Sequence, residues 1–264
     1  PPQASPRVPL TFVGLGLWDQ KDVSLRGLEA IRAADVVYGE WYTAFLGGAA
    51  PDDLVAFYGR PVEWLTRDPL EKGDAILEAA RAKDVVLLAV GDSMTATTHV
   101  DLRVRAQRMG IPTRVVHGAS IATAAAGLLG LFSYKFGRAT TVVYPEGNYF
   151  PTSPYDVIRD NRARGLHTLA LLDLRAAEGR HMSASEGAAL LLRMERERAE
   201  GVLAPETEAY ALARAGSPQP VVARGTLEAL SQADLGPPLH TLVVPGKLHF
   251  VEEEAVQALA EPVA

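Results

Sequence analysis

The chain has 264 residues, of which 48% are hydrophobic and 22% charged, a composition typical of a soluble globular protein. It contains no cysteine, which excludes disulfide scaffolds, thiolate zinc sites and cysteine nucleophiles. A formal net charge of −6 argues against nucleic-acid binding by the whole molecule. No apolar run reaches the roughly 18 residues of a membrane span, and the proline-rich residues 1–9 lack the parts of a signal peptide. We therefore predict a cytoplasmic protein with no membrane or direct nucleic-acid partner.

Strands and helices alternate in the first part of the chain. Short apolar runs that end in turns predict strands at 10–13, 36–38, 84–90 and 114–116. Helices are predicted after the capping residue Ser24, at 75–82 and at 99–109. Residues 47–73 hold Gly, Pro and Asp at short intervals and predict turns with short elements. Strands that are apolar throughout and alternate with helices indicate a parallel sheet covered on both faces.

The character of the sequence changes after Gly118, where Ser120 can cap a helix of small residues that resembles a connection between two lobes. A second series of strands is predicted at 139–144, 167–174, 208–213 and 241–244. The accompanying helices are predicted from Ser153-Pro154, at 184–199 after the Ser183-x-x-Glu186 capping box, near 226–231 and at 252–260. We predict an α/β protein with an N-terminal lobe at 1–118 and a C-terminal lobe at 119–264.

Two loops that follow predicted strands are rich in groups suited to a ligand, since open parallel sheets bind ligands beyond the carboxyl ends of their strands. Gly14-Leu15-Gly16-Leu17 lets the backbone turn sharply, but it lacks the third glycine of a dinucleotide fingerprint, and an ordinary turn explains it equally well. In the loop 91–98, Asp92 could accept from a ribose hydroxyl or oppose a cation. The Ser and Thr residues of that loop could equally be local caps.

Two further segments are candidates. His117-Gly118-Ala119-Ser120-Ile121 leads into a helix whose first backbone amides could meet a polar ligand. His240 follows two prolines, which define its position, although a lone histidine is more often structural. The six histidines have no metal-ligand spacing, and no hydrolase elbow or phosphate loop occurs, so no metal site is predicted. The basic residues between Arg103 and Arg138 form either a solvated surface or a surface that receives a substrate.

Taken together, several segments resemble the tetrapyrrole methylase superfamily and, within it, the diphthine synthase branch. They are FVGLGLWDQ from Phe12, GDSMTATTH from Gly91, HGASI from His117, YPEGNYFPTS from Tyr144 and PPLHTLVVPGKLHFVE from Pro237. The similarity extends from the first strand to the last helix. The resemblance implies two αβα lobes, a cleft between them that holds S-adenosylmethionine, and a homodimer.

The resemblance also implies the cofactor contacts. Carried over by position, they are Leu17, Asp92, Thr95, Ser120, Ile121, Leu172, Ala215 and His240. This chain has Ser93 where the family usually has proline, which leaves the φ angle of that loop less restricted.

The implied reaction transfers methyl groups from S-adenosylmethionine, leaving S-adenosylhomocysteine, and needs no metal. The acceptor would be the amino group of a 3-amino-3-carboxypropyl histidine on translation elongation factor 2, in diphthamide biosynthesis. The catalytic base is not identified by the sequence. The alternatives are a relative acting on a corrinoid precursor or ribosomal RNA, and a binding protein without chemistry.

Overall fold

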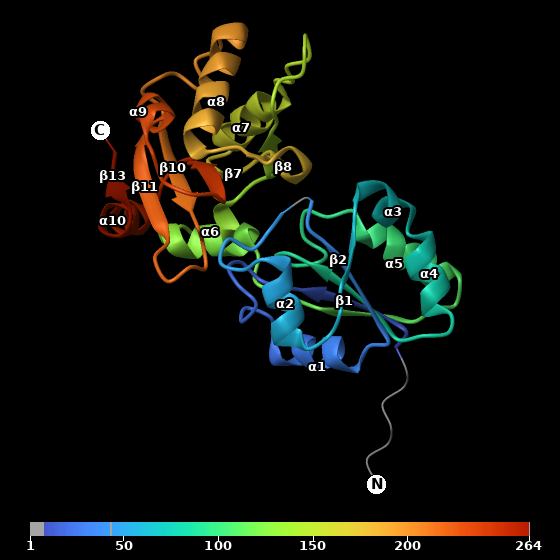
Figure 1. Ribbon diagram of the computed structural model, residues 1–264. Helices are drawn as coiled ribbons and strands as arrows, with labels where there is room; N and C mark the ends of the chain where they lie inside the picture. Colours follow the sequence, from blue (N-terminus) through green and yellow to red (C-terminus); the bar gives the residue numbers. More distant parts are fainter. Residues whose placement is uncertain (1–7, 43, 264) are drawn as a thin grey trace. The chain divides into compact units, whose positions relative to one another are not determined.

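The computed structural model describes residues 8–42 and 44–263 (Figure 1). The proline-rich arm predicted at 1–9 lies, as far as residue 7, outside the described residues. The chain divides into two compact units, and the boundary falls between Ser120 and Ile121. Each of the hydrophobic clusters draws its residues from one unit only. Each unit is therefore a three-layer structure with its own core.

Unit 1, which ends at Ser120, is built on a parallel five-stranded sheet in the order β3-β2-β4-β1-β5. Its strands are β1 (Leu10–Gly14), β2 (Val36–Glu40), β3 (Glu63–Leu65), β4 (Val85–Ala89) and β5 (Thr113–Val116). The central strands β1 and β4 are buried along their whole length, which explains their uninterrupted apolar sequences. The predicted strands of this unit are confirmed; β3 is added within the stretch expected to hold turns and short elements.

Helices cover both faces of this sheet (Figure 1). They are α1 (Leu25–Ala33) and α2 (Pro51–Tyr58) on one face, and α3 (Arg67–Lys72), α4 (Asp74–Ala80) and α5 (His99–Arg108) on the other. Ser24 caps α1, as predicted, by accepting from the Gly27 amide at 3.1 Å. The connection from β1 through α1 leads to β2 on one side of β1. The connection from β4 through α5 leads to β5 on the other side. The switch point at which such sheets bind ligands therefore lies between the carboxyl ends of β1 and β4.

Unit 2, which begins at Ile121, holds a six-stranded mixed sheet in the order β13-β11-β10-β12-β7-β6. Its strands are β6 (Thr140–Val142), β7 (Thr168–Leu172), β10 (Glu208–Ala213), β11 (Val221–Thr226), β12 (His240–Val244) and β13 (Glu261–Pro262). β10 is antiparallel to both of its neighbours, and β12 is antiparallel to β7. β11 was not predicted, because its half-buried sequence VVARGT has no extended apolar run.

The helices of unit 2 also cover both faces of its sheet. α6 (Ile121–Leu129) and α10 (Phe250–Leu259) pack on one face, and α7 (Ser153–Ala163), α8 (Ala184–Arg198) and α9 (Leu227–Gln232) on the other. The capping box that opens α8 is confirmed, since Ser183 and Glu186 each accept from the other's backbone amide. The N-cap of α7 is Thr152, one residue before the predicted Ser153. The predicted α/β class with two αβα units is confirmed.

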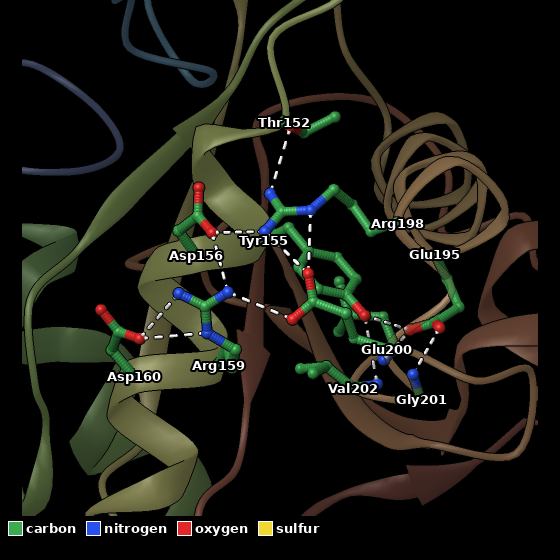
Figure 2. Close-up of polar contacts among 11 residues, drawn as sticks. Thr152, Tyr155, Asp156, Arg159, Asp160, Glu195, Arg198, Glu200, Gly201 and Val202 are labelled. Carbon is green, nitrogen blue, oxygen red and sulfur yellow. Dashed lines mark hydrogen bonds and ion pairs between the residues drawn. The ribbon is translucent and has the colours of Figure 1, made fainter.

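A polar network joins α7 to the end of α8 (Figure 2). The Tyr155 hydroxyl donates to Glu195 at 2.8 Å, and Glu195 accepts from the Gly201 and Leu203 amides at 2.7 and 2.6 Å. Arg198 lies over the Tyr155 ring and pairs with Asp156 at 2.7 Å. Hydrogen bonds from the two amides and from Tyr155 outweigh burial, which favours the neutral acid, and lower the pKa of Glu195. The charged second half of α8 thus closes the helix end, and is not only a solvated face.

Candidate functional site

Four glycines bring the loops after β1, β4 and β5 together at the carboxyl edge of the unit 1 sheet. The Gly16 amide donates to the Gly91 carbonyl at 3.2 Å, and the Gly91 amide donates back at 2.7 Å. A Cβ on Gly118 would lie 2.5 Å from the Gly91 oxygen and 2.8 Å from the Gly14 carbonyl carbon. These backbones pack so closely that a methyl group cannot fit between them.

Asp92 ties the β4 loop to the β5 loop. Its Oδ1 accepts from the Met94 amide at 2.9 Å and from the Thr95 hydroxyl at 3.4 Å. Its Oδ2 accepts from the Gly118 amide at 3.2 Å and from His117 Nδ1 at 2.7 Å. Burial favours the neutral acid, but these hydrogen bonds outweigh it and lower the pKa of the Asp92 carboxyl. Its carboxylate thus organises the loops themselves. His117 belongs to a predicted candidate segment, but its pairing with Asp92 was not predicted.

The Asp22 carboxylate fixes the backbone of the loop that follows β1. Its Oδ2 accepts from the amides of Leu17 and Trp18 at 3.0 and 2.7 Å, so Leu17 is held at a defined position after β1. An Asp six residues beyond Gly16 was the available signal, since Asp side chains bond nearby backbone amides in turns. Gly91 borders open space, because a Cβ there would meet nothing closer than the Ala119 oxygen at 3.9 Å.

Beneath the β4 loop lies a buried pair formed by His99 and Glu40. His99 Nδ1 donates to the Ser93 carbonyl at 2.9 Å, and its Nε2 lies 3.6 Å from Glu40 Oε2. The Thr97 hydroxyl donates to the same carbonyl at 2.7 Å. The buried Ser93 hydroxyl has no hydrogen-bond partner in the described part of the chain. The side chains of His99 and Thr97 thus fix the backbone at Ser93, where the family usually has a proline that would restrict φ.

In unit 2, three of the predicted cofactor residues meet at one edge of the sheet. β7 ends at Leu172, β12 begins at His240, and β10 ends two residues before Ala215. The register places Thr241 opposite Leu171 and His240 opposite Ala213. Because β12 runs antiparallel to β7 and β10, its start lies beside their ends. Residues far apart in the sequence thus come from three adjacent strands.

Both ring nitrogens of His240 are used within unit 2. Nδ1 accepts from the Ala184 amide, the first of α8, at 3.0 Å, and Nε2 donates to the Pro237 carbonyl at 2.9 Å. Burial lowers the pKa of His240 and keeps the imidazole neutral. The ring thus positions the loop before β12, and it offers a ligand no free ring nitrogen.

Arg214 supports the neighbouring turn, which carries Ala215. It adopts a positive φ of 52°, which is uncommon for a residue with a side chain. Its guanidinium donates to the carbonyls of Leu235 and Pro237 at 2.8 and 2.6 Å, and its amide donates to Leu239 at 2.9 Å. Arg214 therefore joins the turn after β10 to the segment before β12.

Next to Leu172, a two-stranded ribbon carries a cluster of charged side chains. The ribbon consists of β8 (Leu174–Arg175) and β9 (Arg180–His181), which pair so that Arg175 faces Arg180. Both guanidinium groups lie over the buried ring of Tyr144, at 5.4 and 4.0 Å from its centroid. Asp173 accepts from Arg175 at 3.3 Å and from the Tyr144 amide at 3.0 Å. Sequence reasoning did not predict any of these four residues as a site residue, although Tyr144 begins one of the segments that carry the family resemblance.

The remaining predicted residues fall at the boundary between the units. Ser120 ends unit 1, and Ile121 begins α6, where its side chain packs partly buried against the core of unit 2. The basic stretch is not one free surface, because Arg105 pairs with Asp74 at 3.0 Å and Lys135 pairs with the buried Glu252. Two of the basic residues in this stretch are therefore already paired within the protein.

The comparisons with known proteins agree with one another. A family model described as Tetrapyrrole (Corrin/Porphyrin) Methylases matches residues 9–231. The chain is 51% identical to a diphthine synthase of Methanocella arvoryzae over 95% of this chain and 98% of that relative. It is 48% identical to the diphthine synthase of Methanosarcina mazei over 96% of both chains. A crystal structure of diphthine synthase matches with a TM-score of 0.87 and 41% identity over 96% of both chains. The chain belongs to the tetrapyrrole methylase family, as a methyltransferase of its diphthine synthase branch.

Proposed function

We propose that this protein transfers methyl groups from S-adenosylmethionine to the amino group of a 3-amino-3-carboxypropyl histidine on translation elongation factor 2. The observation that carries the proposal is the similarity to diphthine synthases, which extends over nearly the whole chain at 51% identity. The reaction is a step of diphthamide biosynthesis, and we propose the cytoplasm as its location. None of the helices in residues 8–42 and 44–263 is long and apolar enough to cross a membrane.

Features at one edge of each sheet support the proposed binding of S-adenosylmethionine. In unit 1, the bare backbone of Gly91 borders open space, and the neighbouring Thr95 is exposed. Leu17 and Ser120 belong to the loops on either side. In unit 2, the turn that carries Ala215 is half-buried at the edge formed with Leu172. We propose that the eight residues carried over from the family bind the cofactor.

The roles of Asp92 and His240 differ from those of free polar ligands. Asp92 accepts four hydrogen bonds from its own unit, and His240 uses both ring nitrogens. We propose that both hold the cofactor-binding backbone in place, and that their contact with the cofactor runs through the remaining surface of the side chain and the main chain. A rigid backbone of this kind lowers the entropy lost on binding.

The chemistry requires mainly positioning. Bound S-adenosylmethionine supplies an electrophilic methyl group on its sulfonium. The protein has to hold the neutral acceptor amine in line with the carbon–sulfur bond, about 3–3.5 Å from the methyl carbon, where orientation alone contributes several kcal/mol. Each attack also needs the amine to lose a proton, for which a carboxylate, tyrosine or water chain would serve.

Cofactor binding is tested by calorimetric titration with S-adenosylhomocysteine. We expect micromolar affinity for the native protein and at least tenfold weaker binding for Asp92→Asn. The amide of that variant keeps the size of the side chain but presents a donor to the Gly118 amide. Glu146→Gln, at an exposed carboxylate of unit 2, serves as the control and should bind normally. Native protein without affinity for S-adenosylhomocysteine would contradict the proposal.

Methyl transfer is tested separately with radiolabelled cofactor and elongation factor 2 that carries the 3-amino-3-carboxypropyl group. Label should enter the modified factor and not the unmodified one. Label found only in a corrinoid precursor or in ribosomal RNA would assign the protein to another substrate class. We also propose a homodimer, for which sedimentation should give about twice the chain mass of 28.3 kDa.

A further inference from the structure

The ribbon β8–β9 of unit 2 is firmly attached to the end of β7. The Asp173 amide donates to the Val142 carbonyl at 3.0 Å, and the Met182 amide donates to the Asp173 carbonyl at 3.0 Å. The ribbon therefore leaves the sheet directly after Leu172 and returns to the same point. The first residue of this segment, Asp173, directly follows Leu172, which is one of the proposed cofactor residues.

The ribbon places two arginines in a pairing that is unfavourable by itself. Arg175 and Arg180 are direct cross-strand partners, and like charges in such positions repel one another. Arg175 is compensated, because it pairs with Glu146 at 2.8 Å and with Asp173 at 3.3 Å. The carboxylate nearest to Arg180 is Glu178, at 3.9 Å, which is too far for a hydrogen bond and is shared with Arg175.

The Arg180 guanidinium lies against an aromatic ring, and its N–H donors remain available to a ligand. It lies 4.0 Å from the centroid of the buried Tyr144 ring, a distance that gives a cation–π contact. It donates no hydrogen bond to any side chain or carbonyl within the described ranges of the chain. Arginine binds carboxylates through two parallel hydrogen bonds, and an arginine already held on a ring loses little entropy in doing so.

We propose that Arg180 binds the carboxylate of the methyl acceptor, and so presents the amine on the neighbouring carbon for methylation. This rests on the proposed function, in which the acceptor carries a 3-amino-3-carboxypropyl group. The carboxylate and the amine are bonded to the same carbon atom. A residue that binds the carboxylate therefore also fixes the position of the amine. Methylation leaves the carboxylate unchanged, and the same contact therefore serves every round of transfer.

The test uses two forms of elongation factor 2, made by semisynthesis, that differ at one group. One carries the 3-amino-3-carboxypropyl histidine, and the other carries its carboxamide, which has no charge to pair with Arg180. We expect the native protein to methylate the acid form at least tenfold more efficiently, measured as kcat/KM. In Arg180→Ala the KM for the acid form should rise at least tenfold, and the preference between the two forms should disappear. Arg180→Lys should retain part of the preference for the acid form.

Arg193→Ala is the matched control. Arg193 also lies 4.0 Å from the centroid of an aromatic ring, that of Phe150, and its side chain is 44% exposed against 49% for Arg180. The Arg193→Ala variant should methylate both acceptors with the native kcat/KM and should bind S-adenosylhomocysteine with native affinity. Arg180→Ala should also bind S-adenosylhomocysteine with native affinity.

Two outcomes separate the inference from the proposed function. Native protein that methylates the acid form, together with an Arg180→Ala variant that keeps the native preference, would overturn the role of Arg180 alone. Native protein that methylates neither form would overturn the proposed function, and the role of Arg180 with it.

Discussion

At the scale of single residues, the polar side chains of this protein are mostly explained by the partners that they hold. Asp92, His240 and Glu252 each join segments distant in the sequence through several hydrogen bonds. In buried surroundings a missing partner costs more than the bond contributes. Single substitutions can therefore separate satisfied groups from unsatisfied ones.

Ser93 is the clearest unsatisfied group. Its buried hydroxyl has no partner among the described residues, whereas the Thr97 hydroxyl donates to the Ser93 carbonyl at 2.7 Å. Ser93→Ala should therefore change the free energy of unfolding by less than about 0.5 kcal/mol, or increase it. Thr97→Val should lower it by about 1 kcal/mol. Urea unfolding of both variants measures the difference, and equal losses would show that the Ser93 hydroxyl is bonded in solution.

Glu252 makes the stability of the protein depend on acid. It is fully buried, accepts from the Phe132 and His249 amides at 2.8 Å, and contacts Lys135 and His167. Burial favours the neutral acid, but these contacts outweigh it and lower the pKa to about 2 from an ordinary value of 4.5.

The stabilisation from Glu252 should therefore be complete above pH 4.5 and be lost as the pH falls from 4.5 to 2. Glu252→Gln should lower the free energy of unfolding by about 3 kcal/mol at pH 7, since it leaves Lys135 without its buried partner. The difference between variant and native protein should shrink toward pH 2. A difference that is independent of pH, measured by urea unfolding at several pH values, would contradict this.

At the scale of elements, the three glycine loops of unit 1 behave as one structure. A Cβ on Gly118 would clash with the backbones of both Gly14 and Gly91, so the loops have to separate to accommodate it. Gly118→Ala should cost about 2 kcal/mol or more of unfolding free energy, as overpacking does, and should weaken S-adenosylhomocysteine binding at least tenfold.

The control for this prediction is Gly127→Ala. Gly127 lies on the exposed side of α6, where a Cβ would meet nothing within 4 Å. Alanine should stabilise the helix there by about 0.5–1 kcal/mol and leave ligand binding unchanged. If both variants bind S-adenosylhomocysteine normally, the close packing of the loops is not needed for the site.

The end of α8 depends on one hydroxyl. The Tyr155 hydroxyl donates to Glu195 and accepts from the Val202 amide at 3.3 Å (Figure 2). Tyr155→Phe leaves the buried ring in place and should lower the free energy of unfolding by about 1–2 kcal/mol. Tyr149→Phe, at a tyrosine that is 65% exposed, should have no measurable effect in the same denaturation assay.

At the scale of the whole molecule, the two units have separate cores. We propose that the lobes predicted at 1–118 and 119–264 unfold as separate cooperative units. Calorimetry should resolve two transitions, of which Gly118→Ala lowers one and Glu252→Gln the other. S-adenosylhomocysteine should raise both, because the proposed contacts come from both units. A single transition that both variants shift equally would show one cooperative unit.

The sequence by itself determined the alternation of strands and helices, the glycine loops at strand ends, the capping box of α8 and the family. These features lie within windows of a few residues, where apolar periodicity and turn chemistry act locally. It did not predict β11, whose half-polar sequence becomes a strand because it completes the hydrogen bonds of β10.

Only the tertiary structure decided which partner each polar group takes. Asp92 meets His117 across 25 residues of sequence, and His240 meets the first amide of α8 across 56. The tertiary structure likewise pairs Arg105 with Asp74, and it places the Arg180 guanidinium over the buried Tyr144 ring with its N–H donors available. Such pairings follow from strand order and register, since a buried polar group takes the partner that the fold brings within about 3 Å.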